Sequence, residues 1–250
     1  MPATFSQSGA TPEIVTTCQA MRAAGAVVIG ITNEPGSPLA ETAQVALLTE
    51  AGPERAIPAT KTVTSQFTVL LGVAAALATG HGPASPAPAT PADGLPALPG
   101  AVTSVLADSV PVSALVDRWR SVDRLVVAGR GLAYAAALET ALKVKETTGI
   151  LAEGLSIADL LHGPIATVYA GAPVLLIDAG GPAATDLGDL RELLARNGAD
   201  AATLPIPPGP EPVAVITAVV RGQQLAHMLS RARGADPDAP TNLTKVTATT

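Results

Sequence analysis

The stretch that most constrains the fold is residues 26–32 (AVVIGIT), an almost unbroken run of apolar side chains. A run of this length is typical of a strand buried on both faces, as in a parallel sheet covered by helices. A helix start precedes it at residues 11–13 (TPE), with a hydroxyl N-cap, a proline in the first turn and an acid beside it. We expect that helix to extend to Ala24 and to end at Gly25.

The same alternation of strand and helix continues along the chain. Further strands are expected at residues 45–49, 125–128, 174–178 and 201–204. Helices are expected at residues 60–79, from the Gly-Arg-Gly turn at 129–131 to about Thr148, at 186–197 and at 212–230, with short helices before the strand at 125–128. Such alternation predicts parallel strands joined by right-handed crossovers, which places the chain in the α/β class.

A change in composition divides the chain. Residues 80–100 interleave prolines with alanine, serine and glycine, a composition typical of a linker or an extended connector. We therefore expect a first α/β subdomain at residues 1–80, a proline-rich linker at 81–100 and a second subdomain at 101–250.

Charge and cysteine content exclude several classes of protein. The net charge of −6 gives no basic footprint, so nucleic acid is not an expected partner. Cys18 is the only cysteine, which excludes an intrachain disulfide and a multi-cysteine metal site. No signal peptide is visible, and the longest apolar stretch, residues 69–78, is about half of a bilayer span. We expect a cytoplasmic protein away from membranes, without metal or cofactor.

The first candidate site is the hydroxyl-rich stretch at residues 6–11 (SQSGAT), between a short start and the first helix. A loop at a helix N-terminus offers free N–H groups and the positive end of the helix dipole, which suit a phosphate group. Hydroxyl-rich helix starts are also common as simple caps, so a capped turn without a ligand is the alternative.

The second candidate site is on the helix that ends near Thr148. Glu139, Lys143 and Glu146 are spaced by four and three residues and therefore share a face. Two interpretations fit: a solvated stripe of salt bridges, or a desolvated glutamate acting as a base beside a lysine. His162 ends a helical stretch, where the helix dipole alone favours it, and Lys245 lies in a tail where a lysine is normally solvated.

Six segments that run in order over nearly the whole chain resemble the sugar isomerase (SIS) domain family, most of all the isomerase half of glucosamine-6-phosphate synthases. They are SQSGATPE at 6–13, NEPGSPLAETAQVALLTEAGPE at 33–54, ATKTVTSQFTVLLG at 59–72, GRGLAYAAALETALKVKE at 129–146, LAEGLSIADLLHGPIA at 151–166 and TNLTKVT at 241–247. The resemblance implies a sugar phosphate as ligand. The positions implied to bind it are Ser6, Gln7, Ser8 and Thr11 in the phosphate loop, Ile57 through its backbone, and Thr244.

The resemblance also implies catalytic roles. Glu146 matches the glutamate that moves a proton between carbon 1 and carbon 2 of the open sugar, and Lys143 matches the lysine one turn before it. His162 matches the histidine that helps to open the sugar ring from the neighbouring subunit. Lys245 matches the lysine that contacts the sugar and forms a Schiff base with its keto form.

The expected architecture is two SIS-type, doubly wound parallel-sheet subdomains in a homodimer with a shared active site. The first subdomain is expected to be truncated at its N-terminus, because the family has an earlier strand and helix. Without a glutaminase segment, the expected reaction is deaminating isomerisation of glucosamine 6-phosphate to fructose 6-phosphate. Dehydration of an N-acetylated amino-sugar phosphate and non-catalytic sensing of a sugar phosphate are the alternatives.

Overall fold

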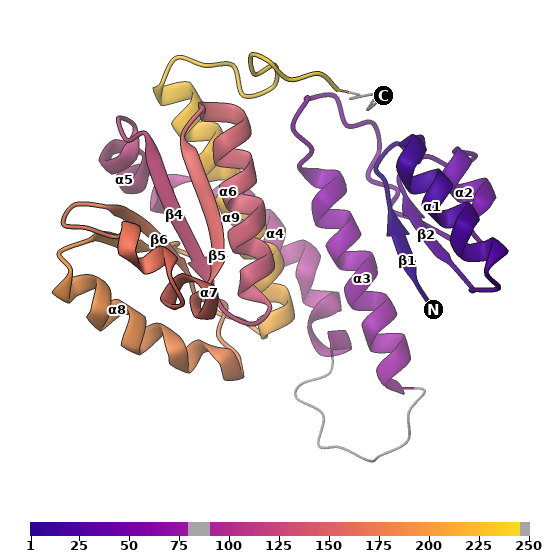
Figure 1. Cartoon of the computed structure of the whole chain (residues 1–250), viewed down its shortest axis with the longest axis horizontal. Coiled ribbons are helices and arrows are strands. Elements are labelled where there is room, and N and C mark those ends of the chain that lie inside the picture. Colours follow the sequence, from indigo (N-terminus) through magenta and orange to yellow (C-terminus); the bar gives the residue numbers. More distant parts are fainter. Residues whose placement is uncertain (80–90, 246–250) are drawn as a thin grey trace. The chain divides into compact units, whose positions relative to one another are not determined.

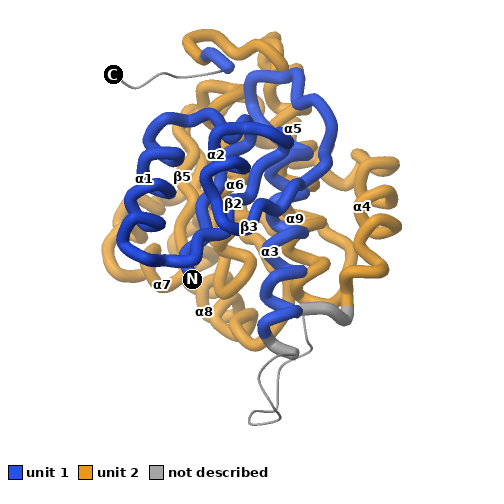
Figure 2. The backbone as a smooth tube through the Cα atoms, turned by 90° about the vertical axis from the view of Figure 1, so that its right-hand side faces the viewer, with its two compact units in different colours: residues 1–82, 244–250 blue, residues 83–243 orange. Residues whose placement is uncertain are grey.

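The computed structural model describes residues 1–79 and 91–245, which group into two units. Unit 1 contains residues 1–82 and 244–250, and unit 2 contains residues 83–243 (blue and orange in Figure 2). Of the described residues after α9, Thr244 and Lys245 group with unit 1, and those up to Leu243 group with unit 2. Ten of the residues expected as linker, 81–90, lie outside the described part of the chain.

Unit 1 is a parallel three-stranded sheet with the strand order β1-β2-β3. Its central strand β2 is buried along its whole length, as expected for the apolar run at 26–32. Figure 1 shows α1 and α2 together on one side of the sheet, and these two helices contact each other. In chain order the elements are β1 (Ala3–Phe5), α1 (Pro12–Ala23), β2 (Ile29–Thr32), α2 (Pro38–Thr42), β3 (Val45–Leu48) and α3 (Lys61–Thr79).

Strand β2 is shorter than the apolar run, because the side chain of Gln44, and not a neighbouring strand, bonds the backbone of Ala26 and Val28. Gln44 accepts a hydrogen bond from Val28 N through Oε1 (2.9 Å) and donates one from Nε2 to Ala26 O (3.0 Å). These bonds satisfy the backbone before the ladder begins at Ile29.

Unit 2 is a parallel four-stranded sheet with the order β5-β4-β6-β7. Helices α6 and α9 pack together on one face, and α7 and α8 contribute to a hydrophobic core on the other (Figure 1). The described elements are η1 (Pro91–Ala97), α4 (Leu98–Ala107), α5 (Val110–Trp119), β4 (Arg124–Gly129), α6 (Ala133–Thr148), β5 (Leu151–Ser156), α7 (Ile157–Leu161), η2 (Pro164–Thr167), β6 (Pro173–Ile177), η3 (Pro182–Thr185), α8 (Asp186–Arg196), β7 (Asp200–Thr203) and α9 (Glu211–Ala232). Parallel sheets between helices confirm the predicted α/β class.

Two elements depart from the sequence-based expectation. The second half of the predicted linker is helical, because η1 and the start of α4 occupy residues 91–100. Pro91 and Pro99 lie in the first turns of η1 and α4, where the first N–H groups have no partner within the helix, whereas Pro96 lies inside η1. Leu98, which follows, is buried. Strand β5 was not predicted: its sequence, LAEGLS, has no β-branched residue. Gly154 is needed there, since an added Cβ would lie 2.7 Å from Leu138 Cα.

Within residues 1–79 and 91–245, no single helix combines the length and the hydrophobicity of a bilayer span. One bent pair, residues 94–107 and 110–119, reaches them only when both helices are counted together.

The close approach of α6 and α9 makes a testable prediction. A Cβ added at Gly222 on α9 would lie 2.0 Å from Thr140 Oγ1 and 2.9 Å from Thr140 Cβ on α6. We expect Gly222→Ala to lower the free energy of unfolding of unit 2 by about 1–3 kcal/mol through overpacking. Denaturant unfolding followed by the fluorescence of Trp119, the single tryptophan and a fully buried one, measures this directly.

Gly188→Ala is the matched control, because Gly188 lies on α8 with nothing within 4 Å of the added Cβ. There alanine should stabilise the helix by up to about 1 kcal/mol. Equal effects of the two substitutions would contradict the close packing of α6 on α9.

Candidate functional site

The hydroxyl-rich loop of unit 1 connects β1 to α1 and is organised by its own side chains. Ser6 Oγ and Thr11 Oγ1 are 3.0 Å apart, and Ser6 Oγ also accepts a hydrogen bond from Gly9 N (3.1 Å). Ala10 N donates to Ser8 Oγ (3.3 Å). Thr11 is the N-cap residue, as expected, but its hydroxyl bonds Ser6 and makes no cap to the helix. The hydroxyls therefore gather within the loop.

The shape of this loop depends on Gly9 and on the end of β2. Gly9 has φ +62°, and a Cβ there would lie 2.0 Å from Ser37 Oγ and 2.7 Å from Thr32 Oγ1. The carbonyl of Gln7 accepts hydrogen bonds from Thr32 Oγ1 (3.2 Å) and Asn33 N (3.0 Å). The loop is thus held at the carboxyl ends of β1 and β2, the edge where open parallel sheets bind ligands.

A second cluster in unit 1 surrounds the carboxylate of Glu54. Its oxygens accept hydrogen bonds from Thr60 N (3.1 Å), Thr62 N (3.0 Å) and Thr62 Oγ1 (2.8 Å), at the start of α3. Partial burial raises the pKa of Glu54, but these hydrogen bonds and the nearby charge of Lys245 outweigh burial, and the net pKa is lowered. Glu54 is therefore a fixed negative charge that caps α3.

The C-terminal tail meets this cluster. The Nζ of Lys245 donates a hydrogen bond to the backbone carbonyl of Ala56, next to the half-buried Ile57. Thr244 precedes Lys245 and is exposed. Three residues named from the sequence, Ile57, Thr244 and Lys245, thus belong to unit 1 together with the phosphate loop.

In unit 2 the acidic and basic residues of α6 form a buried cluster. The Nζ of Lys143 lies 2.5 Å from Glu146 Oε2 and 3.9 Å from Glu139 Oε1, and Lys143 is 4% exposed. Gln223 on α9 donates a hydrogen bond to Glu139 Oε1 (3.2 Å). Glu146 is the most accessible of the three, with a side chain 23% exposed. This burial excludes a solvated stripe of salt bridges.

The carboxyl group of Glu139 is strongly perturbed by its burial. Burial raises the pKa of Glu139 to about 7, although Lys143 and the hydrogen bond from Gln223 act to lower it; the charge of Glu146 also raises it. The sequence placed Glu139 on the same helix face as Lys143 and Glu146 but assigned it no role. The missing information was its burial against α9, which helical spacing within α6 does not contain.

His162 lies far from this cluster within the same chain. It is exposed and caps the end of α7, beyond the carboxyl end of β5. Glu146 is in the last turn of α6, which leads into the beginning of β5. Because β5 has six residues, its ends are on the order of 17 Å apart. Figure 1 shows α7 at the carboxyl end of β5 and the end of α6 at its amino end.

The Gly-Arg-Gly turn after β4 carries an ion pair: Arg130 Nε lies 2.8 Å from Asp186 Oδ2, and both side chains are substantially exposed. The structure has a turn at residues 131–132, as expected after this strand.

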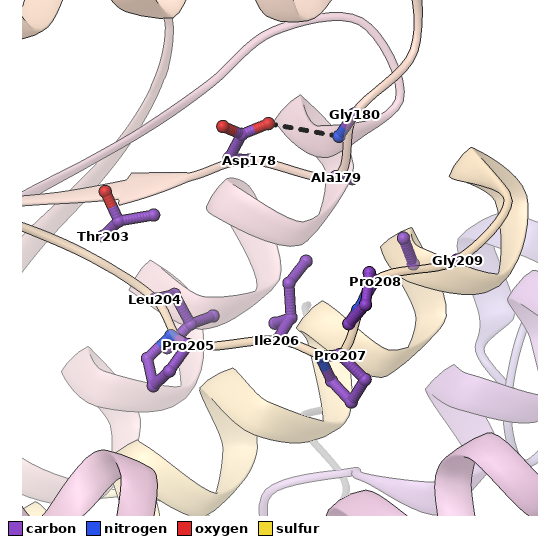
Figure 3. Close-up of a pocket in the computed structure, with 11 residues that line it drawn as sticks. Asp178, Ala179, Gly180, Thr203, Leu204, Pro205, Ile206, Pro207, Pro208 and Gly209 are labelled. Atoms are coloured by element: carbon purple, nitrogen blue, oxygen red, sulfur yellow. Dashed lines mark hydrogen bonds between the residues drawn. The ribbon is translucent and has the colours of Figure 1, made fainter.

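Unit 2 also contains a cavity of about 470 Å³ at the carboxyl ends of β6 and β7. Figure 3 shows Asp178 and Thr203 beside the apolar side chains of Leu204, Ile206 and the neighbouring prolines. The carboxylate of Asp178 is already engaged, by Gly180 N (3.1 Å) and by Arg191 Nη2 (3.1 Å). The cavity contains none of the residues named from the sequence. Among the residues that the structure describes, no three His, Cys, Asp or Glu side chains gather as metal ligands would.

Comparison with known proteins identifies the family that the sequence resembles. The SIS domain model matches residues 4–76 and 120–206. The glutamine–fructose-6-phosphate aminotransferases of Pyrococcus horikoshii and Escherichia coli strain K12 are 34% and 32% identical, over 96% and 97% of this chain. Each alignment covers 42% of the relative, so the chain spans less than half the length of these curated relatives.

Two solved structures have the same fold. The C-terminal domain of glucosamine-fructose-6-phosphate aminotransferase from Francisella tularensis gives a TM-score of 0.83 at 23% identity, over 95% of this chain and 72% of that one. The glucosamine-6-phosphate deaminase of Thermotoga maritima gives 0.79 at 26% identity, over 97% of this chain and 73% of that one.

The raised pKa of Glu139 predicts how stability depends on pH. The folded protein retains the Glu139 proton up to about pH 7, whereas the unfolded chain releases it near 4.5. The stability that this proton contributes is full below about pH 4.5 and is lost as pH rises through 7, with a total change of about 3 kcal/mol at most. Glu139→Gln should remove this slope. Urea unfolding of both proteins at several pH values tests it, and parallel pH profiles would contradict it.

Proposed function

The chain belongs to the SIS domain family, and from this premise we propose that it is an amino-sugar phosphate isomerase that transfers a proton between carbon 1 and carbon 2 of the open sugar. The proposed reaction converts glucosamine 6-phosphate and water to fructose 6-phosphate and ammonia, by isomerisation to the ketose imine and its hydrolysis, or runs in reverse. The observation that carries the proposal is the buried pairing of Lys143 with Glu146, beside Glu139.

The phosphate group is assigned to the loop at residues 6–11. Ser6, Gln7, Ser8 and Thr11 surround a turn at the carboxyl edge of the sheet, directly before α1. Backbone N–H groups and the helix dipole favour an anion there, and such a site does not require a lysine or an arginine. This assignment is compatible with the acidic net charge of the whole chain.

Proton transfer is assigned to Glu146. A general base must be accessible to its substrate and must also be held in place. The carboxylate of Glu146 meets both needs, since its side chain is 23% exposed and one oxygen is 2.5 Å from the buried Lys143 ammonium. The hydrogen bond from Lys143 holds the Glu146 carboxylate in place, and Glu139 Oε1 lies 3.9 Å from the same Lys143 Nζ.

The remaining two roles need other parts of the fold. Lys245 is assigned to the keto sugar, where its amine adds to carbon 2 of fructose 6-phosphate and water leaves to form a Schiff base. His162 is assigned to ring opening. His162 and Glu146 lie at opposite ends of the strands of the same sheet, too far apart to act on one sugar within a chain. In the proposed homodimer, the His162 of one chain therefore completes the site that contains the Glu146 of the other.

The direction to test first is deamination, because a related structure at 26% identity is named a glucosamine-6-phosphate deaminase. We expect the purified protein to release ammonia and fructose 6-phosphate in equal amounts from glucosamine 6-phosphate, measured by coupled assays. Glu146→Gln should lower turnover by at least about a hundredfold, because it removes the base, with little change in ligand affinity measured by calorimetry.

Binding without turnover in the unsubstituted protein would contradict the isomerase proposal. It would favour a sugar-phosphate sensor or a different phosphorylated substrate, such as an N-acetylated amino sugar.

A shared site makes a second prediction. Glu146→Gln and His162→Ala should each be inactive alone, but mixing the two should restore activity after subunit exchange. In a random mixture half of the dimers are mixed and one of their two sites is intact, so we expect about one quarter of full activity. Mixing each variant with itself is the control. Absence of recovery, with subunit exchange verified by mass spectrometry, would contradict a site built from two chains.

A further inference from the structure

We propose that Glu54 is a positioning residue for Lys245: by closing the segment from residue 54 to residue 60, it presents the carbonyl that anchors the Lys245 ammonium. This inference rests on the proposed function for the role of Lys245 in catalysis. The anchoring itself is a property of unit 1 and can be measured without turnover.

The first step is the closure of the segment. Both ends of residues 54–60 are held by one carboxylate, because Glu54 accepts hydrogen bonds from the backbone and hydroxyl of Thr60 and of Thr62. Thr62 is fully buried, so its hydroxyl bond of 2.8 Å is shielded from water. A closed segment of this kind has a defined carbonyl geometry, whereas an open loop has not.

The second step is the anchor. Within the closed segment, the carbonyl of Ala56 accepts the hydrogen bond from Lys245 Nζ, and Ile57 follows directly. The negative charge of Glu54 lies close enough to the ammonium for a mutual electrostatic attraction. Glu54 therefore acts on Lys245 both through the shape of the segment and through charge.

The third step links this geometry to the chemistry. A Schiff base forms only when the amine approaches the sugar carbonyl carbon in a suitable direction, and a small misplacement lowers the rate strongly. Lys245 lies after α9 in a segment that has no helix or strand among its described residues, so no backbone ladder fixes its position. The hydrogen bond to the Ala56 carbonyl restricts the position of its ammonium.

Competitive labelling tests the anchor without any substrate. The protein is acetylated with a limiting amount of acetic anhydride, and labelling at each lysine is measured by mass spectrometry, with the exposed Lys145 in unit 2 as internal reference. We expect Glu54→Gln to raise labelling of Lys245 relative to Lys145 by at least about threefold. Glu50→Gln, which removes the same charge from an exposed residue of the same unit, should leave the ratio unchanged.

The catalytic consequence is tested by borohydride trapping. Fructose 6-phosphate forms the imine with Lys245 by loss of water, and borohydride adds hydride to the imine carbon to give a stable secondary amine. At saturating sugar phosphate we expect Glu54→Gln to lower the trapping rate about tenfold or more, with ligand affinity changed less than threefold. If Glu54→Gln does not fold, Thr62→Val is the second variant, because it removes the 2.8 Å hydroxyl bond to Glu54. We expect it also to raise the labelling of Lys245 and to lower the trapping rate.

The outcomes separate the two proposals. Unchanged labelling of Lys245 in Glu54→Gln or Thr62→Val overturns the positioning role of Glu54. Raised labelling in a protein whose unsubstituted form traps no sugar supports the anchor and contradicts the proposed role of Lys245 in catalysis. Equal losses of trapping and of ligand binding in Glu54→Gln would show general collapse of the segment, which also overturns the proposal.

Discussion

The buried ammonium of Lys143 is the interaction on which most of the proposed chemistry depends. A charge with 4% exposure is costly to bury unless a partner compensates it. The Glu146 carboxylate, 2.5 Å from Lys143 Nζ, is that partner, and Glu139 lies 3.9 Å away on the same helix face. The desolvation comes from elsewhere in unit 2. Helix α9 covers the face, and its Gln223 supplies a hydrogen bond to Glu139. Glu139 and Lys143 are thus shielded from solvent, whereas Glu146 remains accessible.

The close packing of α6 on α9 maintains this environment. Gly222 permits the approach, because any Cβ at that position would collide with Thr140 on α6. On its other side α6 contacts β4 and β5, so the helix is fixed by the sheet as well. The pKa of Glu139 is therefore a consequence of tertiary packing, and a change in the helix–helix contact would change the charge state of the site.

Much of the fold followed from local sequence patterns, and much of the site did not. The apolar run at 26–32 predicted a buried parallel strand because burial on both faces leaves a clear signature. The edge strand β5, whose sequence LAEGLS has no β-branched residue, gave no such signature. The proline-rich residues 91–100 were misleading, because prolines occur both in linkers and in first turns of helices.

For the site, helical spacing placed Glu139, Lys143 and Glu146 on one face, but only the packing of α9 distinguishes a buried cluster from a solvated stripe. The contact of Lys245 with Ala56 joins residues far apart in the sequence, so no local pattern contains it. The electrostatic link between Glu54 and Lys245 is equally distant in the sequence, although the hydrogen-bond partners of Glu54, Thr60 and Thr62, are only six and eight residues away.

The measurement that tests the central claim most directly is hydrogen exchange at the sugar itself. The protein is incubated with fructose 6-phosphate and ammonium in deuterium oxide, and deuterium at carbon 1 of the ketose is followed by NMR. If Glu146 removes a proton from this carbon and the proton exchanges with solvent before it returns, deuterium appears in the ketose with the unsubstituted protein, and Glu146→Gln must abolish the exchange. Tight binding of the sugar phosphate with neither deuterium exchange nor formation of glucosamine 6-phosphate in the unsubstituted protein would contradict the account of Lys143 and Glu146 as a proton-transfer pair.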